Sequence, residues 1–121
     1  MILIVDDMPF ICHLLIEYLA DVGYPAVGAA DGREALHSLR TQPIQLVLLD
    51  INMPVMNGWE LLQAMHADPT LAGIPVVLMS AAEGMHQIAL KQGAIGYLPK
   101  PLDLDKLLGI VQSHVREQPE A

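Results

Sequence analysis

Three aspartates in this sequence come directly after apolar runs. Asp6 and Asp7 follow Ile2–Val5. Asp50 follows Leu46–Leu49. Apolar runs of this length predict strands buried on both faces, and open α/β sheets bind ligands at the C-terminal ends of such strands. If the two strands are neighbours, three carboxylates meet at one edge, and their mutual repulsion requires a nearby cation. Oxygen ligands that leave room for several waters suit Mg²⁺ better than a caged Ca²⁺.

A hydroxyl and an ammonium group are predicted at the same edge. Ser80 ends the apolar run Ile74–Met79, and Lys100 follows Gly96–Leu98. Together they could hold an anion with several oxygens against Asp50, and a phosphoryl group fits. Carboxylates attack phosphoryl groups to form aspartyl-phosphates, and Mg²⁺ and lysine would neutralise the charge of the in-line transfer. Taken singly, each of these residues has a simpler explanation as a solvated turn, a helix cap or a surface cation. Their combination predicts a phosphoryl-accepting site centred on Asp50.

The segments that position these residues alternate between strand and helix patterns. Besides Ile2–Val5, the predicted strands are Pro25–Ala30, Leu46–Asp50, Ile74–Met79 running into Ser80, and Gly96–Leu98. The predicted helices follow Pro9, Asp31, the loop 53–58, Glu83 and Asp103. This alternation predicts an α/β fold, a doubly wound five-stranded parallel sheet with helices on both faces. No repeat or linker interrupts residues 1–121, so we expect one domain, with 117–121 as a frayed tail.

The composition limits the classes of function. The chain has 121 residues, 53% of them hydrophobic, and a formal net charge of −8. A hydrophobic content this high argues against disorder, and the acidic charge argues against direct binding of nucleic acid or an anionic membrane. No apolar run approaches the ~20 residues of a membrane span, and the N-terminus lacks the basic region of a signal peptide. Cys12 is the only cysteine, which excludes an internal disulfide and fits a cytoplasmic location.

Four segments carry a specific resemblance to a known family. They are Ile4–Asp7, Leu49–Pro54 with Gly58, Pro75–Ala81, and Gly93–Pro101. Through them the chain, from Ile2 to about Val115, resembles the receiver domains of two-component response regulators. The resemblance implies the strand order 2-1-3-4-5. It also implies that Asp50 accepts a phosphoryl group from a histidine kinase or a histidine phosphotransfer protein.

The resemblance implies roles for the other site residues. Mg²⁺, with Mn²⁺ as its substitute, would be held by Asp6, Asp7, Asp50 and the backbone carbonyl of Asn52. Ser80 and Lys100 would bind the phosphoryl group. Tyr97 would be the switch aromatic that turns inward as Ser80 moves, and the Lys100–Pro101 bond would be cis.

The expected function is a phosphorylation-dependent switch, and other functions compete with it. The switch would be no conventional enzyme, although it would catalyse its own phosphoryl uptake and slow autodephosphorylation. It would act as a monomer or weak dimer, and the face formed by the fourth helix, fifth strand and fifth helix would signal to an unknown partner.

A haloacid-dehalogenase-type phosphohydrolase would need a second acid two residues after Asp50, where this chain has Asn52. A flavodoxin-like cofactor binder would need an anion-binding loop in place of Asp6-Asp7. A phosphorylation-independent receiver would not need the complete residue set.

The remaining reactive residues are expected to be structural. No two of the five histidines lie three or four residues apart, so the helical metal pair of a zinc site is absent. Trp59 is expected to pack, while able to report on the site by fluorescence. Cys12 is expected to be a buried apolar residue or an unreactive surface thiol.

Overall fold

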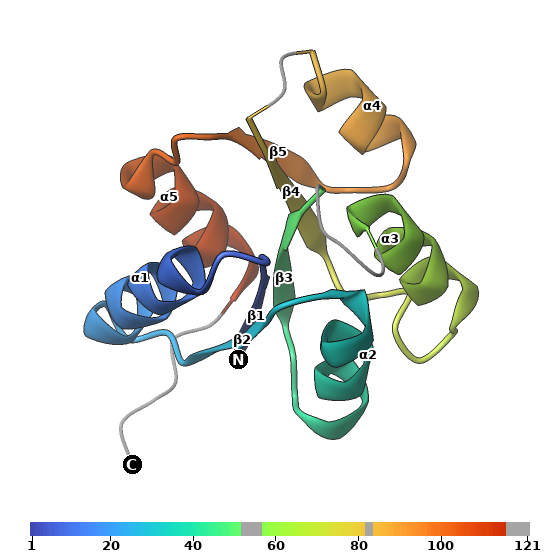
Figure 1. Cartoon of the computed structure of the whole chain (residues 1–121), viewed down its shortest axis with the longest axis horizontal. Coiled ribbons are helices and arrows are strands. Elements are labelled where there is room, and N and C mark those ends of the chain that lie inside the picture. Colours follow the sequence, from blue (N-terminus) through green and yellow to red (C-terminus); the bar gives the residue numbers. More distant parts are fainter. Residues whose placement is uncertain (52–56, 82–83, 116–121) are drawn as a thin grey trace.

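Strands and helices alternate along the whole described chain. The structure is a computed structural model, and it describes residues 1–51, 57–81 and 84–115. In chain order the elements are β1 Ile2–Val5, α1 Pro9–Asp21, β2 Ala26–Ala29, α2 Gly32–Thr41, β3 Leu46–Asp50, α3 Gly58–Ala67, β4 Val76–Ser80, α4 His86–Lys91, β5 Gly96–Pro99 and α5 Leu104–His114 (Figure 1). Within those ranges, no helix is long and apolar enough to cross a bilayer.

The five strands form one parallel sheet in the order β2-β1-β3-β4-β5. This confirms the predicted fold class and strand order. Strands β1 and β3 are neighbours, paired from Ile2 opposite Leu46 to Val5 opposite Leu49. The next residues of the two strands are Asp6 and Asp50, so the pairing itself brings two carboxylates to the same edge.

Helices cover both faces of the sheet and explain the uninterrupted apolar strands. Helices α1 and α5 lie on one face, and α2, α3 and α4 lie on the other (Figure 1). Successive residues of a strand point to opposite faces. Accordingly, Leu3 and Val5 join the core on the α2–α3–α4 side, whereas Ile2 and Ile4 join the core on the α1–α5 side. The central strands β1, β3 and β4 are buried on both faces of the sheet. They therefore have apolar residues at every position before their C-terminal ends, where the site lies.

The starts of two elements differ from the predictions by more than one residue. Strand β4 begins at Val76, not Ile74, because the Ile74 N–H donates to the Leu71 carbonyl and closes a turn. Helix α4 begins at His86, not near Glu83, because Gly84 has a φ of +73° that helical residues do not adopt. Strands β2 and β5 differ from their predicted bounds by one residue at their ends.

Side-chain caps fix the starts of three helices. Asp31 accepts a hydrogen bond from the Glu34 N–H at 2.9 Å, as the sequence predicts. Asp103, which precedes the last predicted helix, accepts a hydrogen bond from the Asp105 N–H at 2.9 Å. Helix α3 begins with a reciprocal capping box between Asn57 and Glu60, a pattern that can also be read in the sequence but was not predicted. Each cap satisfies backbone N–H groups that would otherwise lack partners.

Candidate functional site

Three carboxylates meet where β1 and β3 end. Asp6, Asp7 and Asp50 each offer an oxygen atom, and these atoms lie within 4.8 Å of one another. Asp6 and Asp50 are 1% and 5% exposed, while Asp7 is exposed to solvent. The Met8 N–H donates to Asp6 Oδ1 at 3.0 Å and so fixes one side of that carboxylate. A cluster made only of oxygen donors and open on the Asp7 side has the chemistry to hold a hard divalent cation.

Lys100 supplies a positive charge from the loop after β5. Its Nζ donates to Asp6 Oδ2 at 2.9 Å and lies 3.6 Å from Asp50 Oδ2. Burial by itself would lower the pKa of Lys100, but the hydrogen bond and charge of Asp6, together with the charge of Asp50, outweigh burial and raise it. Lys100 therefore stays protonated at neutral pH, on a flexible side chain that can change partners.

Ser80 links the ends of β4 and β5. Its side chain is at the buried end of β4, and the residue is 1% exposed. Its carbonyl oxygen accepts the Lys100 backbone N–H at 2.8 Å and the Tyr97 hydroxyl at 3.2 Å. The Lys100–Pro101 peptide bond is cis, as the resemblance implied. Backbone and side-chain hydrogen bonds therefore hold Ser80, Tyr97 and Lys100 in one cluster beside Asp50.

Gly58 lets α3 begin directly against the Asp50 backbone. Its N–H donates to the Ile51 carbonyl at 2.9 Å. A Cβ added at Gly58 would lie 2.7 Å from the Asp50 carbonyl oxygen and 2.8 Å from the Ile51 Cα. No side chain larger than hydrogen fits this contact without a backbone shift. The sequence indicates Gly58 as part of a segment that matches the receiver family, but its close contact with the Asp50 backbone is visible only in the structure.

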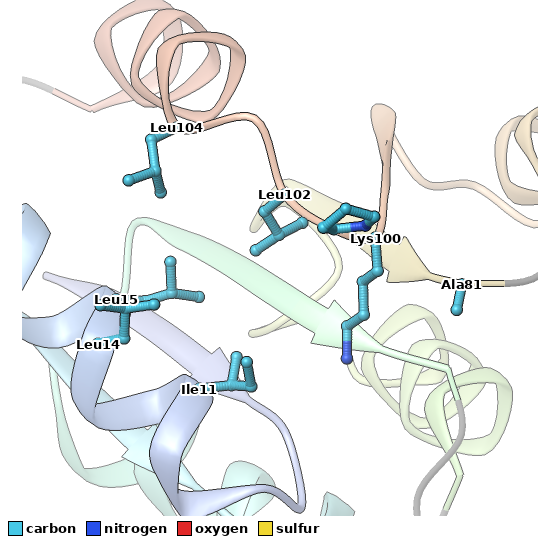
Figure 2. Close-up of a pocket in the computed structure, with 8 residues that line it drawn as sticks. Ile11, Leu14, Leu15, Ala81, Lys100, Leu102 and Leu104 are labelled. Atoms are coloured by element: carbon cyan, nitrogen blue, oxygen red, sulfur yellow. The ribbon is translucent and has the colours of Figure 1, made fainter.

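An apolar pocket borders the site on the α1 side. Its volume is about 480 Å³, and its lining residues are Ile11, Leu14, Leu15, Ala81, Lys100, Pro101, Leu102 and Leu104 (Figure 2). In Figure 2 the Lys100 side chain extends along one side toward the C-terminal end of β3. Large apolar side chains near the start of α1 are exposed, namely Met8 at 52%, Phe10 at 71% and Leu14 at 45%. Leu14 recurs at helical spacing with Ile11 and Leu15 in the sequence, but it lies at the exposed margin of this apolar stripe.

The structure brings together most of the predicted site residues. Asp6, Asp7, Asp50 and Lys100 form one charged cluster, to which Ser80 is joined through hydrogen bonds of its carbonyl oxygen. The predicted metal ligand Asn52 lies outside the described residues.

Cys12 and Trp59 have packing roles. Cys12 is buried, with Sγ 3.4 Å from the Asp6 carbonyl oxygen. Burial first, and then the charge of Asp6, raises the pKa of its thiol. Trp59 is half-buried and packs against the core on the α2–α3–α4 side, as expected.

The sequence matches the response regulator receiver domain family over residues 2–112. The chain belongs to this family. Receiver domains are signalling domains of two-component systems, so residues 2–112 form a signalling domain. Among solved structures, the receiver fold is found in the chemotaxis response regulator CheY4 of Vibrio cholerae, at a TM-score of 0.84 and 32% identity, covering 93% of this chain and 95% of that one. A response regulator receiver protein from Pseudomonas putida has a TM-score of 0.87 and 30% identity, covering 93% and 95%.

Curated relatives of this receiver domain are longer proteins. The transcriptional regulatory protein ZraR of Escherichia coli is 41% identical over 109 residues, which are 88% of this chain and 24% of that protein. The DNA-binding response regulator MtrA of Mycolicibacterium smegmatis is 32% identical over 117 residues, which are 95% of this chain and 50% of that protein. The chain spans about half or less of the curated relatives it matches.

Proposed function

We propose that this receiver domain is a phosphorylation-dependent switch that accepts a phosphoryl group on Asp50. The observation that carries the proposal is the position of Lys100, whose Nζ lies between Asp6 and Asp50 at the carboxylate cluster. A nucleophilic carboxylate beside a movable cation and a cation-binding carboxylate pair is an arrangement suited to phosphoryl transfer. The phosphohydrolase alternative finds no support, because Asn52 replaces the second acid it would need.

In the proposed reaction an Asp50 carboxylate oxygen attacks the phosphorus of a phosphohistidine. The new O–P bond forms as the donor's P–N bond breaks, and the electron pair of that bond stays on the leaving imidazole nitrogen. Mg²⁺ bound by Asp6 and Asp7 would supply positive charge for the phosphoryl oxygens. Lys100 would exchange its contact with Asp50 for one with the phosphoryl group, and the Ser80 hydroxyl would bind another of its oxygens. Slow autodephosphorylation would return the switch to its starting state.

The donor is proposed to dock on α1. Met8, just before α1, and Phe10 and Leu14 on it are exposed apolar residues, and Leu14 lines the apolar pocket that Lys100 also borders. Exposed apolar side chains grouped beside a reactive site are typical of protein-binding surfaces. A histidine kinase or a histidine phosphotransfer protein that buries these residues would bring its phosphohistidine near Asp50.

The output surface is proposed to be the face formed by α4, β5 and α5. Ile88 and Leu90 on α4 are each 46% exposed, and Ile95 just before β5 is 42% exposed. Phosphorylation would act on this face through Ser80 and the switch residue Tyr97, whose hydroxyl already bonds the Ser80 carbonyl. In physical terms the phosphoryl group would shift the populations of two arrangements of this face, one of which binds the downstream partner.

The proposal is tested by weighing the intact protein after incubation with acetyl phosphate and Mg²⁺. The expected result is the mass of one added phosphoryl group, absent when EDTA is present during the incubation and absent in Asp50→Asn. Asp21→Asn, which changes an exposed aspartate at the end of α1, is the matched control and should gain the same mass as the native chain. No added mass, or the same gain in Asp50→Asn, would reject the proposal.

A further inference from the structure

The first residue of α4 is in ring contact with Tyr97. The ring centroids of His86 and Tyr97 are 5.9 Å apart, and the ring planes are tilted by 47°. This is a separation and tilt at which aromatic rings attract each other beyond the effect of burial alone. His86 is exposed, whereas Tyr97 is half-buried, so the contact joins a surface residue to a tyrosine packed against the core.

Tyr97 is held at both ends of its side chain. The ring contacts His86, and the hydroxyl donates to the Ser80 carbonyl oxygen at 3.2 Å. The same carbonyl accepts the Lys100 N–H at 2.8 Å. A change in the Tyr97 orientation therefore affects both the end of β4 at the site and the beginning of α4.

The beginning of α4 has no side-chain cap, as is also true of α1, where Pro9 occupies the first turn instead. Helices α2, α3 and α5 begin with a side-chain cap, but Met85 at the N-cap of α4 has helical backbone angles and makes no side-chain cap hydrogen bond. The helix has six residues, of which Ala89 is buried. A short helix whose first N–H groups lack a cap can rearrange at low cost. The ring contact between His86 and Tyr97 therefore helps to stabilise the first turn of α4 in its described position.

We propose that His86 is a positioning residue for Tyr97. Its ring favours the described Tyr97 orientation and transmits any change of that orientation to the first turn of α4. The inference rests on the proposed function, in which Tyr97 is the switch residue, and it adds a partner for that residue which the receiver resemblance does not supply. In the proposed reaction His86 contacts neither the phosphoryl group nor the metal. It acts only through Tyr97.

The first test examines the unphosphorylated protein. The ¹H–¹³C signals of the Tyr97 ring are assigned by comparison with Tyr97→Phe and then recorded in three variants. His86→Ala should shift them, with a roughly two- to tenfold fall in the ratio of the described orientation to the alternative one. His86→Phe, which keeps a ring at this position, should restore the native signals. His37→Ala removes an exposed histidine from α2 and should leave them unchanged. Unshifted Tyr97 signals in His86→Ala would overturn the proposal.

The second test adds acetyl phosphate and Mg²⁺ and compares the backbone amide signals of α4 before and after. His86→Ala should gain the same phosphoryl mass as the native chain, while its phosphorylation-dependent α4 shifts shrink by roughly twofold or more. His86→Phe should recover them. An undiminished α4 response in His86→Ala rejects transmission through the ring contact. Absence of the phosphoryl mass in the native chain rejects the proposed function instead, and the first test still decides whether His86 positions Tyr97.

Discussion

At the residue scale, Lys100 balances the charge of the acidic site. The side chains of its two carboxylate partners are nearly inaccessible, with 0% of Asp6 and 7% of Asp50 exposed, while 20% of the Lys100 side chain is exposed. Removing one member of a buried ion pair leaves its partner charged without compensation, which costs more than the pair contributes by forming. The same lysine therefore matters for the stability of the fold before any phosphoryl group arrives.

Replacing Lys100 by methionine should destabilise the metal-free protein by about 2–3 kcal/mol, because Asp6 and Asp50 lose their cation. Urea denaturation in EDTA measures this change. Mg²⁺ should stabilise the variant more than the native chain, since the metal then supplies the missing charge. Lys106→Met, at an exposed lysine on α5, is the control and should stay within about 0.5 kcal/mol of native stability.

The pH dependence of the same experiment follows from the raised pKa of Lys100. When folding raises the pKa of a cationic group, that group stabilises the folded state fully at any pH below its ordinary pKa, which is about 10.5 for lysine. The stabilisation is lost as the pH rises through the pKa of the group in the folded protein. The stability difference between native chain and Lys100→Met should thus hold from pH 7 to about 10 and shrink above that. A difference that disappears near neutral pH would contradict the ion-pair explanation.

Individual residues were predictable where their type and position in a strand were both informative. Asp6, Asp50 and Lys100 were found because each follows a strand that the apolar pattern predicts. The contact between His86 and Tyr97 was not predictable, since it depends on where an uncapped helix begins. The exposure of Leu14 was not predictable either, because a helical apolar stripe shows which residues share a side of the helix but not how wide its buried part is.

At the element scale, the contact between α3 and β3 depends on Gly58. Substitution by alanine would place a methyl group 2.7 Å from the Asp50 carbonyl oxygen, and both nearby groups are backbone atoms that cannot move aside. We expect Gly58→Ala to lower the free energy of unfolding by about 1–3 kcal/mol. Because the strain falls on Asp50, it should also slow phosphoryl uptake from acetyl phosphate. Urea denaturation and the intact-mass time course measure the two effects.

Gly109 provides the matched control for Gly58. It lies in the middle of α5, and an added Cβ there would meet nothing within 4 Å. Gly109→Ala should therefore stabilise the chain by up to about 1 kcal/mol, because alanine loses less backbone entropy in a helix. If both alanine variants changed stability equally, the close approach at Gly58 would not be the cause.

The elements were predictable in type and less so at their boundaries. The apolar runs identified β1, β3 and β4 because these strands are buried on both faces, whereas the edge strands β2 and β5 are partly exposed and have weaker patterns. The start of β4 was misplaced because Ile74 is as apolar as a strand residue but closes a turn with Leu71. The start of α4 was misplaced because nothing in the side-chain pattern revealed the positive φ of Gly84.

At the scale of the whole molecule, the fold separates two exposed apolar surfaces. The group Met8, Phe10 and Leu14 belongs to α1 and the turn before it, whereas Ile88, Leu90 and Ile95 belong to α4 and the segment before β5. Figure 1 shows α1 and α4 on opposite sides of the sheet. The sheet order that creates this separation was predicted with help from the family resemblance, since alternating strands and helices alone do not specify which strands are neighbours.

This separation predicts that substitutions on α1 and α4 have different effects. Phe10→Ser should slow phosphoryl transfer from a phosphorylated histidine phosphotransfer protein by roughly tenfold or more. The reason is that the Phe10 side chain, which is 71% exposed, is a candidate for the centre of the surface that contacts the donor. Uptake from acetyl phosphate, which needs no docking, should remain native. Leu90→Ser is the matched control on α4 and should leave both rates unchanged. The rates are measured by following the radioactive phosphoryl group from each donor onto Asp50. Equal slowing with both donors would mean that Phe10→Ser damages the site itself, and equal slowing by both variants would place the donor contact elsewhere.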